Sequence, residues 1–165
     1  NYNYIISRIS FVVTYYIIRL NMKKLILLCI TIFIISFGSL ANEISAIEAA
    51  KKLKDNIMII DVRNKSEWKE TGVIPGAKLI QMLSSARTIR KEYISELMDV
   101  LGEDKNIEAA IICHSGGRSS ATVAMLKEKG FTNIFNVSEG MVGNGNTTGW
   151  TNRNLPIKKC DDACK

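Results

Sequence analysis

The fold of this chain follows from one stretch, which reads Ala110-Ile111-Ile112-Cys113-His114-Ser115-Gly116-Gly117-Arg118-Ser119-Ser120-Ala121. An apolar run ends at Cys113, and four residues that include two adjacent glycines separate this cysteine from Arg118. A helical pattern then extends from Ser119 to Lys129. This order predicts a strand, a tight loop and a helix, with the Cys113 sulfur at the carboxyl edge of a buried strand.

The loop after Cys113 has the features of an anion-binding site. Backbone N–H groups in such a loop can point inward, and the N-terminus of the following helix adds a partial positive charge. A ring of donors of this kind favours the thiolate form of Cys113. Arg118 adds a planar fork of donors suited to an oxyanion. The stretch therefore predicts a reactive sulfur beside an anionic substrate.

The N-terminal part of the chain does not have the composition of a folded domain. Residues 1–21 form a patchy Tyr/Ile-rich segment, which we interpret as a non-native upstream extension. Residues 22–41 are typical of a secretory signal peptide, because two lysines precede an apolar run and small residues precede a cleavage point after Ala41. The apolar run, 25–37, is shorter than the about 20 residues that cross a membrane. We expect cleavage and a periplasmic location, with membrane contact only through this segment if it stays uncleaved.

Charge does not indicate a nucleic-acid partner. The formal net charge is +6, but four of the 22 basic residues and none of the 16 acidic ones precede residue 42. The remaining part is therefore nearly balanced, and we expect no nucleic-acid binding. Its length suits one compact domain with one core.

Residues 42–157 predict a single α/β domain, with a mostly parallel central sheet flanked by helices, and residues 158–165 form a polar C-terminal tail. Continuous apolar runs are typical of parallel strands that are covered on both faces. The expected strands are 57–62, 78–81, 107–112 and 133–137. The expected helices are one capped by Ser45 and running through Leu53, then 65–70, 88–101 and 119–129. The last helix is expected to bury Ala121, Val123, Ala124 and Leu126.

Four motifs in this order resemble the rhodanese family. They are Asp61-Val62-Arg63 with Glu67-Trp68, Gly72 to Ala77, Cys113 to Ser119, and Glu139-Gly140-Met141 with Gly149-Trp150. The resemblance covers about residues 44–157 and is closest to small exported sulfurtransferases. It implies an α/β sandwich around a parallel sheet and sulfur transfer through a cysteine persulfide. Val73 stands where the family often has histidine. Residues 142–148 are interposed between Met141 and Trp150, and because of this insertion substrate preference transfers less well than the chemistry.

The resemblance implies that Cys113 is catalytic. Its thiolate would attack the outer sulfur of a small anionic donor such as thiosulfate, and a thiol or cyanide acceptor would then take the sulfur, without a metal or cofactor. Arg118 would hold the sulfonate. The other expected substrate-binding residues are His114, Ser115, Gly116, Gly117 and Ser119. His114 is expected to point outward, because the N–H groups of the loop point inward. A role as a base is not expected, because a thiolate that has already formed needs none.

The remaining candidate residues have structural interpretations. Ser119 could cap the helix rather than touch substrate. Asp61 and Arg63 are expected to be buried structural polar residues that hold the loop after the first strand, not an acid/base pair. Trp68 and Trp150 are expected to pack in the core or at its rim rather than to form a cofactor platform.

Three alternatives remain open from sequence alone. A cysteine-dependent phosphatase or arsenate reductase also uses a Cys-loop-Arg cradle, but its loop is one residue longer, and the tighter ring here suits a sulfur atom better. A non-catalytic persulfide carrier would need Cys113 yet show poor turnover with free thiosulfate. In a thiol–disulfide role, Cys160 or Cys164 would resolve Cys113, whereas a Cys160–Cys164 bond would be a structural staple.

Overall fold

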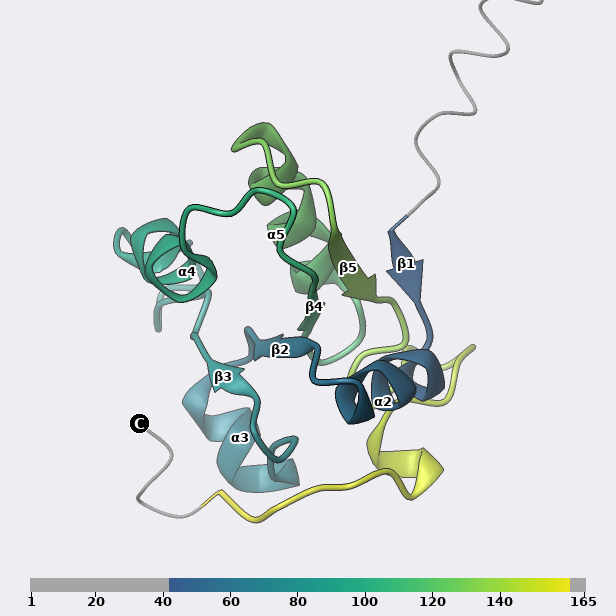
Figure 1. Cartoon of the computed structure of the whole chain (residues 1–165). Helices are drawn as coiled ribbons and strands as arrows, with labels where there is room; N and C mark the ends of the chain where they lie inside the picture. The colour runs from purple at the N-terminus through teal and green to yellow at the C-terminus, as the bar shows by residue number, and fades with distance from the viewer. Residues whose placement is uncertain (1–41, 161–165) are drawn as a thin grey trace, which may run out of the picture. The chain divides into compact units, whose positions relative to one another are not determined.

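The computed structural model describes residues 42–160, which form an α/β domain (Figure 1). The expectations for residues 1–21 and for the signal peptide at 22–41 lie outside the described residues, as does Cys164. Among the residues that are described, no helix is both long and apolar enough to cross a membrane.

The central sheet has five strands in the order β1-β5-β4-β2-β3. Each neighbouring pair is parallel, which confirms the predicted sheet. The strands are β1 (Glu43–Ile44), β2 (Met58–Asp61), β3 (Lys78–Leu79), β4 (Ala109–Ile112) and β5 (Ile134–Val137). The sequence did not indicate β1, a strand of two residues at one edge. The strand that delivers Cys113, β4, lies in the middle of the sheet, and all four of its residues are buried.

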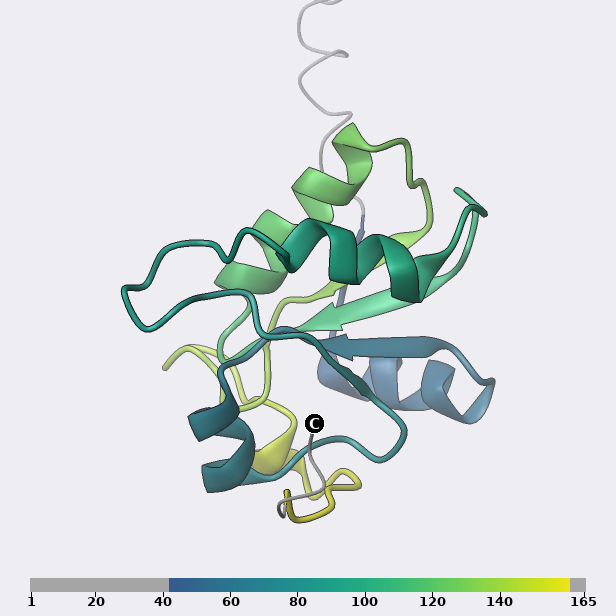
Figure 2. The ribbon, with the colours of Figure 1, turned by 90° about the vertical axis from the view of Figure 1, so that its left-hand side faces the viewer.

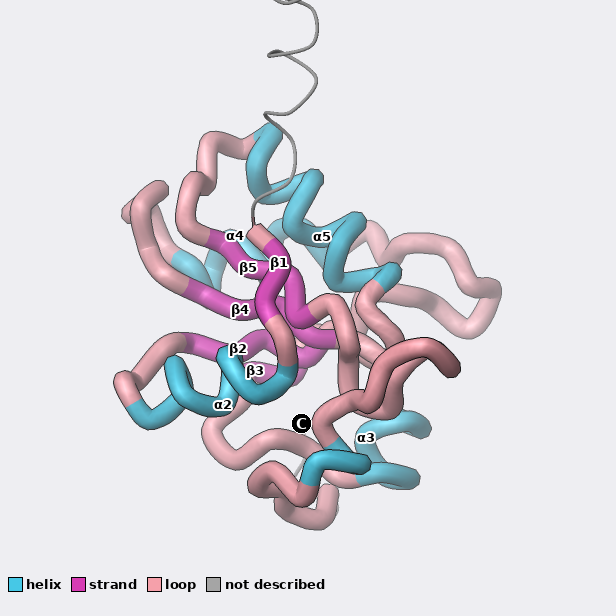
Figure 3. Tube along the Cα trace, turned by 90° about the vertical axis from the view of Figure 1, so that its right-hand side faces the viewer, coloured by secondary structure: helices cyan, strands magenta, loops and turns pink. Residues whose placement is uncertain are grey.

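The helices cover the two faces of the sheet. They are α2 (Ala46–Lys54), α3 (Lys65–Thr71), α4 (Tyr93–Leu101) and α5 (Gly117–Glu128), with a short 3-10 helix, η2 (Thr151–Arg153). Figures 2 and 3 show α4 and α5 on one side of the sheet and α2 and α3 on the other. Ser45 caps α2 through a reciprocal capping box with Glu48, as the sequence predicts.

Alternation along the strands builds two hydrophobic layers, because successive side chains of a strand point to opposite faces. In β4, Ile111 joins the cluster that includes residues of α4 and α5, whereas Ala110 and Ile112 join the cluster on the α2 side. Cys113 belongs to the same cluster as Ile111. The cysteine side chain therefore lies on the α4/α5 face of the sheet. Trp150 lies in the α2-side cluster, and this confirms its role in core packing.

Two expectations about helices are wrong. The helix predicted from residue 88 begins at Tyr93, because the preceding segment folds back on itself: Leu83 pairs with Ile89 in an antiparallel bridge, and Ile89 is exposed. In α5, Ala121 and Ala124 are exposed and Val123 is only partly buried. The buried face of α5 carries Ser119, Thr122 and Leu126, which share one side at helical spacing. The prediction is therefore confirmed for Leu126 only, because the other two members of the buried face carry hydroxyls and apolar periodicity does not detect them.

Asp61 and Arg63 are fully buried, as predicted, and form an ion pair with each other. The Arg63 guanidinium donates to both carboxylate oxygens of Asp61 and also to the backbone oxygens of Glu67 and Gly72. These bonds fix α3 to the end of β2. Trp68 of α3 is buried in a small cluster with Val73 and Cys160, so its packing role is also confirmed.

The interposed segment 142–148 forms a tight turn rather than an open loop. Gly143 and Thr148 pair in an antiparallel bridge. Inside the turn, the side-chain oxygen of Asn144 accepts hydrogen bonds from the backbone N–H groups of Asn146 and Thr147. These local hydrogen bonds stabilise the turn in the interposed segment.

Candidate active site

Cys113 lies directly after β4 and is 1% exposed. It is a free thiol, whereas Cys160 is disulfide-bonded. Within residues 42–160 the structure therefore contradicts a bond between Cys113 and Cys160. A buried thiol at the carboxyl end of a central parallel strand matches the predicted position of the reactive sulfur.

The loop after Cys113 keeps its backbone donors available. Gly116 takes the left-handed conformation, with φ of 92°, and α5 begins at Gly117. Among the described residues, no acceptor receives a hydrogen bond from the backbone N–H groups of residues 114–119. Unpaired N–H groups in the first turn of a helix attract anions. The backbone donors that the sequence predicts for an anion-binding loop are thus unpaired among the described residues.

The loop is held in place by the segment that follows β5. The N–H of Met141 donates to the Cys113 carbonyl over 2.8 Å, and the N–H of Val142 donates to the His114 carbonyl over 2.9 Å. A Cβ atom on Gly140 would lie 2.5 Å from the His114 oxygen, and one on Gly116 would lie 2.1 Å from the Ser138 oxygen. Both positions therefore require glycine, which gives the Glu139-Gly140-Met141 motif a physical role in supporting the loop.

Hydroxyl groups of α4 and α5 lie near Cys113 and in the core next to it. The Ser119 hydroxyl is 3.3 Å from Cys113 Sγ and 2.9 Å from the Gly116 carbonyl, and its single proton can be donated to only one of these two acceptors at a time. Gly116, not Ser119, is the N-cap of α5, so the expectation that Ser119 caps the helix is wrong. Deeper in the core, the Tyr93 and Thr122 hydroxyls lie 2.5 Å apart. Burial raises the pKa of Tyr93, which therefore stays neutral and serves as a hydrogen-bonding partner.

Arg118 is paired with a residue that the sequence analysis did not assign to the site. Its two terminal nitrogens donate to the two carboxylate oxygens of Glu67 over 2.7 and 2.6 Å. The Glu67 carboxylate also accepts from the backbone N–H of Asn64, and its Oε1 lies 3.2 Å from His114 Nδ1. The signal for Glu67 was its place in the Glu67-Trp68 motif, but the motif does not reveal a partner 51 positions away.

Opposing effects act on the Glu67 carboxyl. Burial raises its pKa, but the hydrogen bonds from Arg118 and Asn64, with the charges of Arg118 and His114, outweigh burial and lower the pKa overall. The same contact raises the pKa of Arg118. Both groups are therefore charged at neutral pH, and the pair is a two-pronged salt bridge.

The other predicted site residues surround the cysteine with differing exposure. Gly116 and Ser119 are buried, Ser115 is partly buried, and Gly117 is exposed. The side chain of Arg118 is 20% exposed and that of His114 is 46% exposed. The outward position of His114 agrees with the expectation that it points away from the sulfur. The structure thus brings all seven predicted residues to one loop and the first turn of one helix.

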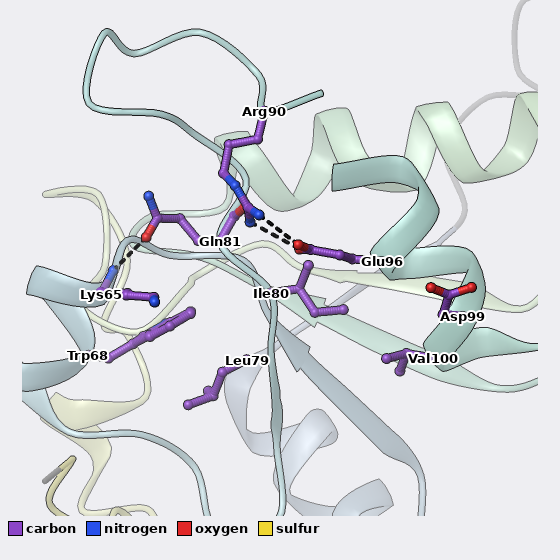
Figure 4. A pocket seen from close by; sticks show the side chains of 9 residues that line it. All are labelled: Lys65, Trp68, Leu79, Ile80, Gln81, Arg90, Glu96, Asp99 and Val100. Atoms are coloured by element: carbon purple, nitrogen blue, oxygen red, sulfur yellow. Dashed lines mark hydrogen bonds and ion pairs between the residues drawn. The ribbon is translucent and has the colours of Figure 1, made fainter. Parts of the chain in front are cut away.

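A separate pocket of about 630 Å³ lies beside the edge of the sheet (Figure 4). It is lined by Lys65, Trp68, Leu79, Ile80, Gln81, Arg90, Glu96, Asp99 and Val100. An ion pair between Arg90 and Glu96 spans one wall, and the Lys65 N–H donates to the Gln81 side chain. Cys113 is not among the lining residues, so this pocket is distinct from the cysteine site.

The fold and the site together define a class of protein: a parallel α/β domain that presents a thiol in a strand–loop–helix anion cradle. Residues 45–145 match the Rhodanese-like domain family. The chain belongs to this family, which confirms the resemblance drawn from the sequence.

Relatives and solved structures agree with this assignment. A protein of Allochromatium vinosum named sulfurtransferase is 28% identical over 120 residues, which cover 72% of this chain and 95% of that protein. The crystal structure of Rv0390 from M. tuberculosis superposes with a TM-score of 0.63 at 26% identity, over 74% of this chain and all of that one. A rhodanese-like domain protein from Staphylococcus aureus superposes with a TM-score of 0.51 at 29% identity, over 72% and 99% of the two chains.

Proposed function

We propose that this protein is a sulfurtransferase that moves sulfane sulfur from thiosulfate, or a similar small donor, to a thiol or cyanide acceptor through a persulfide on Cys113. The observation that carries the proposal is the free, buried Cys113 beside the unpaired N–H groups of residues 114–119. A relative named sulfurtransferase supports the same reaction type.

The reaction proceeds in two displacement steps. The Cys113 thiolate attacks the outer sulfur of thiosulfate, a new S–S bond forms at Sγ, and the S–S bond of the donor breaks with release of sulfite. The resulting Cys113 persulfide anion has its charge stabilised by the loop N–H groups. The acceptor then attacks the terminal sulfur of the persulfide. Cyanide leaves as thiocyanate and a thiolate leaves as a new persulfide, and in both cases the Cys113 thiolate is regenerated.

We also propose that residues 22–41 direct export and that the protein acts in the periplasm. The composition of this segment supports the proposal. The disulfide at Cys160 supports it as well, because disulfides persist in oxidising compartments.

The test of the proposed function is formation of thiocyanate from thiosulfate and cyanide by the purified protein and by Cys113→Ser. We expect turnover by the first and none by the second, together with a mass increase of one sulfur atom on Cys113 after exposure to donor alone. Equal thiocyanate formation by the two proteins would contradict the proposal. Persulfide on Cys113 without turnover would instead favour the carrier function.

A further inference from the structure

The charge of Arg118 is already compensated before any substrate binds. Both terminal nitrogens of its guanidinium are bound by Glu67, and the two side chains are only 20% and 18% exposed. The Glu67 carboxylate is fixed in turn by the Asn64 N–H at the start of α3. A sulfonate that approached Arg118 would therefore compete with a preorganised carboxylate for the same two nitrogens.

Among residues 42–160, the other groups that act on Arg118 do not restore a free cation at this position. The charged groups that act on Arg118 are Glu67, Cys113 and Asp61, all of which are acidic. Arg63, which lies four positions before Glu67 in the sequence, is fully buried and paired with Asp61. The remaining basic group beside Glu67 is the ring of His114. A dianionic donor such as thiosulfate thus meets the backbone N–H groups of the loop, and an Arg118 guanidinium whose charge Glu67 already compensates.

We propose that Glu67 determines donor specificity, by holding Arg118 away from the substrate and so favouring persulfide donors over thiosulfate. This inference rests on the proposed sulfur transfer through Cys113. Thiosulfate releases sulfite, a dianion whose oxygens need strong donors, whereas a persulfide releases a single thiolate. The backbone N–H groups of residues 114–119 remain for the transferred sulfur in both cases.

The reaction with a persulfide balances without any further reagent. The Cys113 thiolate attacks the terminal sulfur of R–S–SH, a bond forms between Sγ and that sulfur, and the S–S bond of the donor breaks. The leaving group is the thiolate RS⁻, and the proton stays on the transferred sulfur. No net oxidation or reduction takes place, so the step needs only the donor and the cysteine.

The experiment compares the wild-type protein, Glu67→Gln and Glu70→Gln with two donors, thiosulfate and glutathione persulfide. Glu67→Gln retains the size of the side chain and removes its charge, which frees the guanidinium to bind an anion. Glu70→Gln is the matched control, since Glu70 lies on the same helix and is exposed. We expect Glu67→Gln to raise kcat/KM for thiosulfate about tenfold or more, mainly through KM, because a charge-assisted hydrogen bond becomes available.

The persulfide donor distinguishes specificity from a structural role. We expect kcat/KM for glutathione persulfide to stay within about twofold in both variants, and the thiosulfate gain to disappear in the double variant Glu67→Gln/Arg118→Gln. Equal losses with both donors in Glu67→Gln would show that Glu67 only braces the loop, and would overturn the inference. If Glu67→Gln does not fold, Glu67→Asp replaces it, because the shorter side chain cannot hold both nitrogens, and a smaller gain in the same direction is expected.

Failure of the inference differs from failure of the proposed function. If the wild-type protein acquires sulfur on Cys113 from neither donor, the proposed sulfur transfer is itself wrong. If it uses thiosulfate at least as well as the persulfide, and Glu67→Gln does not raise kcat/KM for thiosulfate, the transfer stands and the role of Glu67 in specificity is refuted.

Discussion

Gly140 supports the cysteine loop through close contact, and Gly140→Ala should therefore destabilise the protein and displace the loop. The position has φ of +63°, and an added Cβ would lie 2.5 Å from the His114 oxygen and 2.6 Å from the Ser115 nitrogen. An alanine in the left-handed region costs about 1–2 kcal/mol. The collision with backbone adds about 1–3 kcal/mol, because neither neighbour is a side chain that can rotate away.

Gly76→Ala is the matched control for this prediction. Its φ is +81°, but an added Cβ would meet nothing within 4 Å. The control therefore measures the conformational term alone, about 1–2 kcal/mol. The excess loss in Gly140→Ala then measures the close approach of the two loops.

The assay is urea unfolding of the three proteins, with the free energy of unfolding extrapolated to water, alongside sulfur transfer to Cys113. We expect Gly140→Ala to lose about 1–3 kcal/mol more than Gly76→Ala and to lose most of its transfer activity. Gly76→Ala should retain the activity, since Gly76 lies in a turn before β3. Equal losses of stability with full activity in both variants would refute the role assigned to Gly140.

Three further predictions concern buried polar groups. The pKa of the Glu67 carboxyl is held below its ordinary value of 4.5, so its carboxylate stabilises the fold above that pH, and this contribution is lost as the pH falls through the folded-state pKa. Glu67→Gln should flatten that part of an acid-unfolding curve. Asp61→Asn leaves the buried Arg63 guanidinium without its counter-charge and should cost about 3–5 kcal/mol in urea unfolding. Tyr93→Phe removes the hydroxyl that lies 2.5 Å from Thr122 and should cost about 1 kcal/mol by the same measurement.

These predictions have a common control in an exposed ion pair. Lys52 and Glu108 form a pair whose side chains are 36% and 50% exposed. Glu108→Gln should change the free energy of unfolding by less than about 0.5 kcal/mol. A loss in Asp61→Asn no larger than this would contradict the buried-charge argument, and an unchanged acid limb in Glu67→Gln would contradict the lowered pKa.

Sequence reasoning succeeded where local chemistry dictates structure. The apolar run before Cys113 and the glycines after it specify a strand and a tight turn within a few residues of one another, and the structure has both. The buried pair of Asp61 and Arg63 was also predictable, because charged residues at the end of an apolar strand must be paired. In each case the partners are close in the chain.

The contacts that sequence reasoning missed join distant segments or use polar atoms in the core. Glu67 reaches Arg118 only because α3 and α5 converge in the folded domain. The buried face of α5 carries Ser119 and Thr122, whose hydroxyls contact Cys113 and Tyr93, so apolar periodicity identified only Leu126 of this face. The start of α4 was misplaced because the tertiary bridge between Leu83 and Ile89 outweighs local helix propensity.

The α3 helix is hydrogen-bonded both to the end of β2 and to Arg118 at the start of α5. At the end of β2, Arg63 holds it through the backbone oxygens of Glu67 and Gly72, and at its first turn Glu67 holds Arg118. The same residue, Glu67, therefore receives a hydrogen bond from Arg63 on its backbone and from Arg118 on its side chain. Because both bonds end on Glu67, the buried pair of Asp61 and Arg63 at the end of β2 is linked through this residue to the Arg118 guanidinium. The Arg118 guanidinium is thereby tied to α3, whereas the backbone N–H groups of residues 114–119 remain unpaired among the described residues.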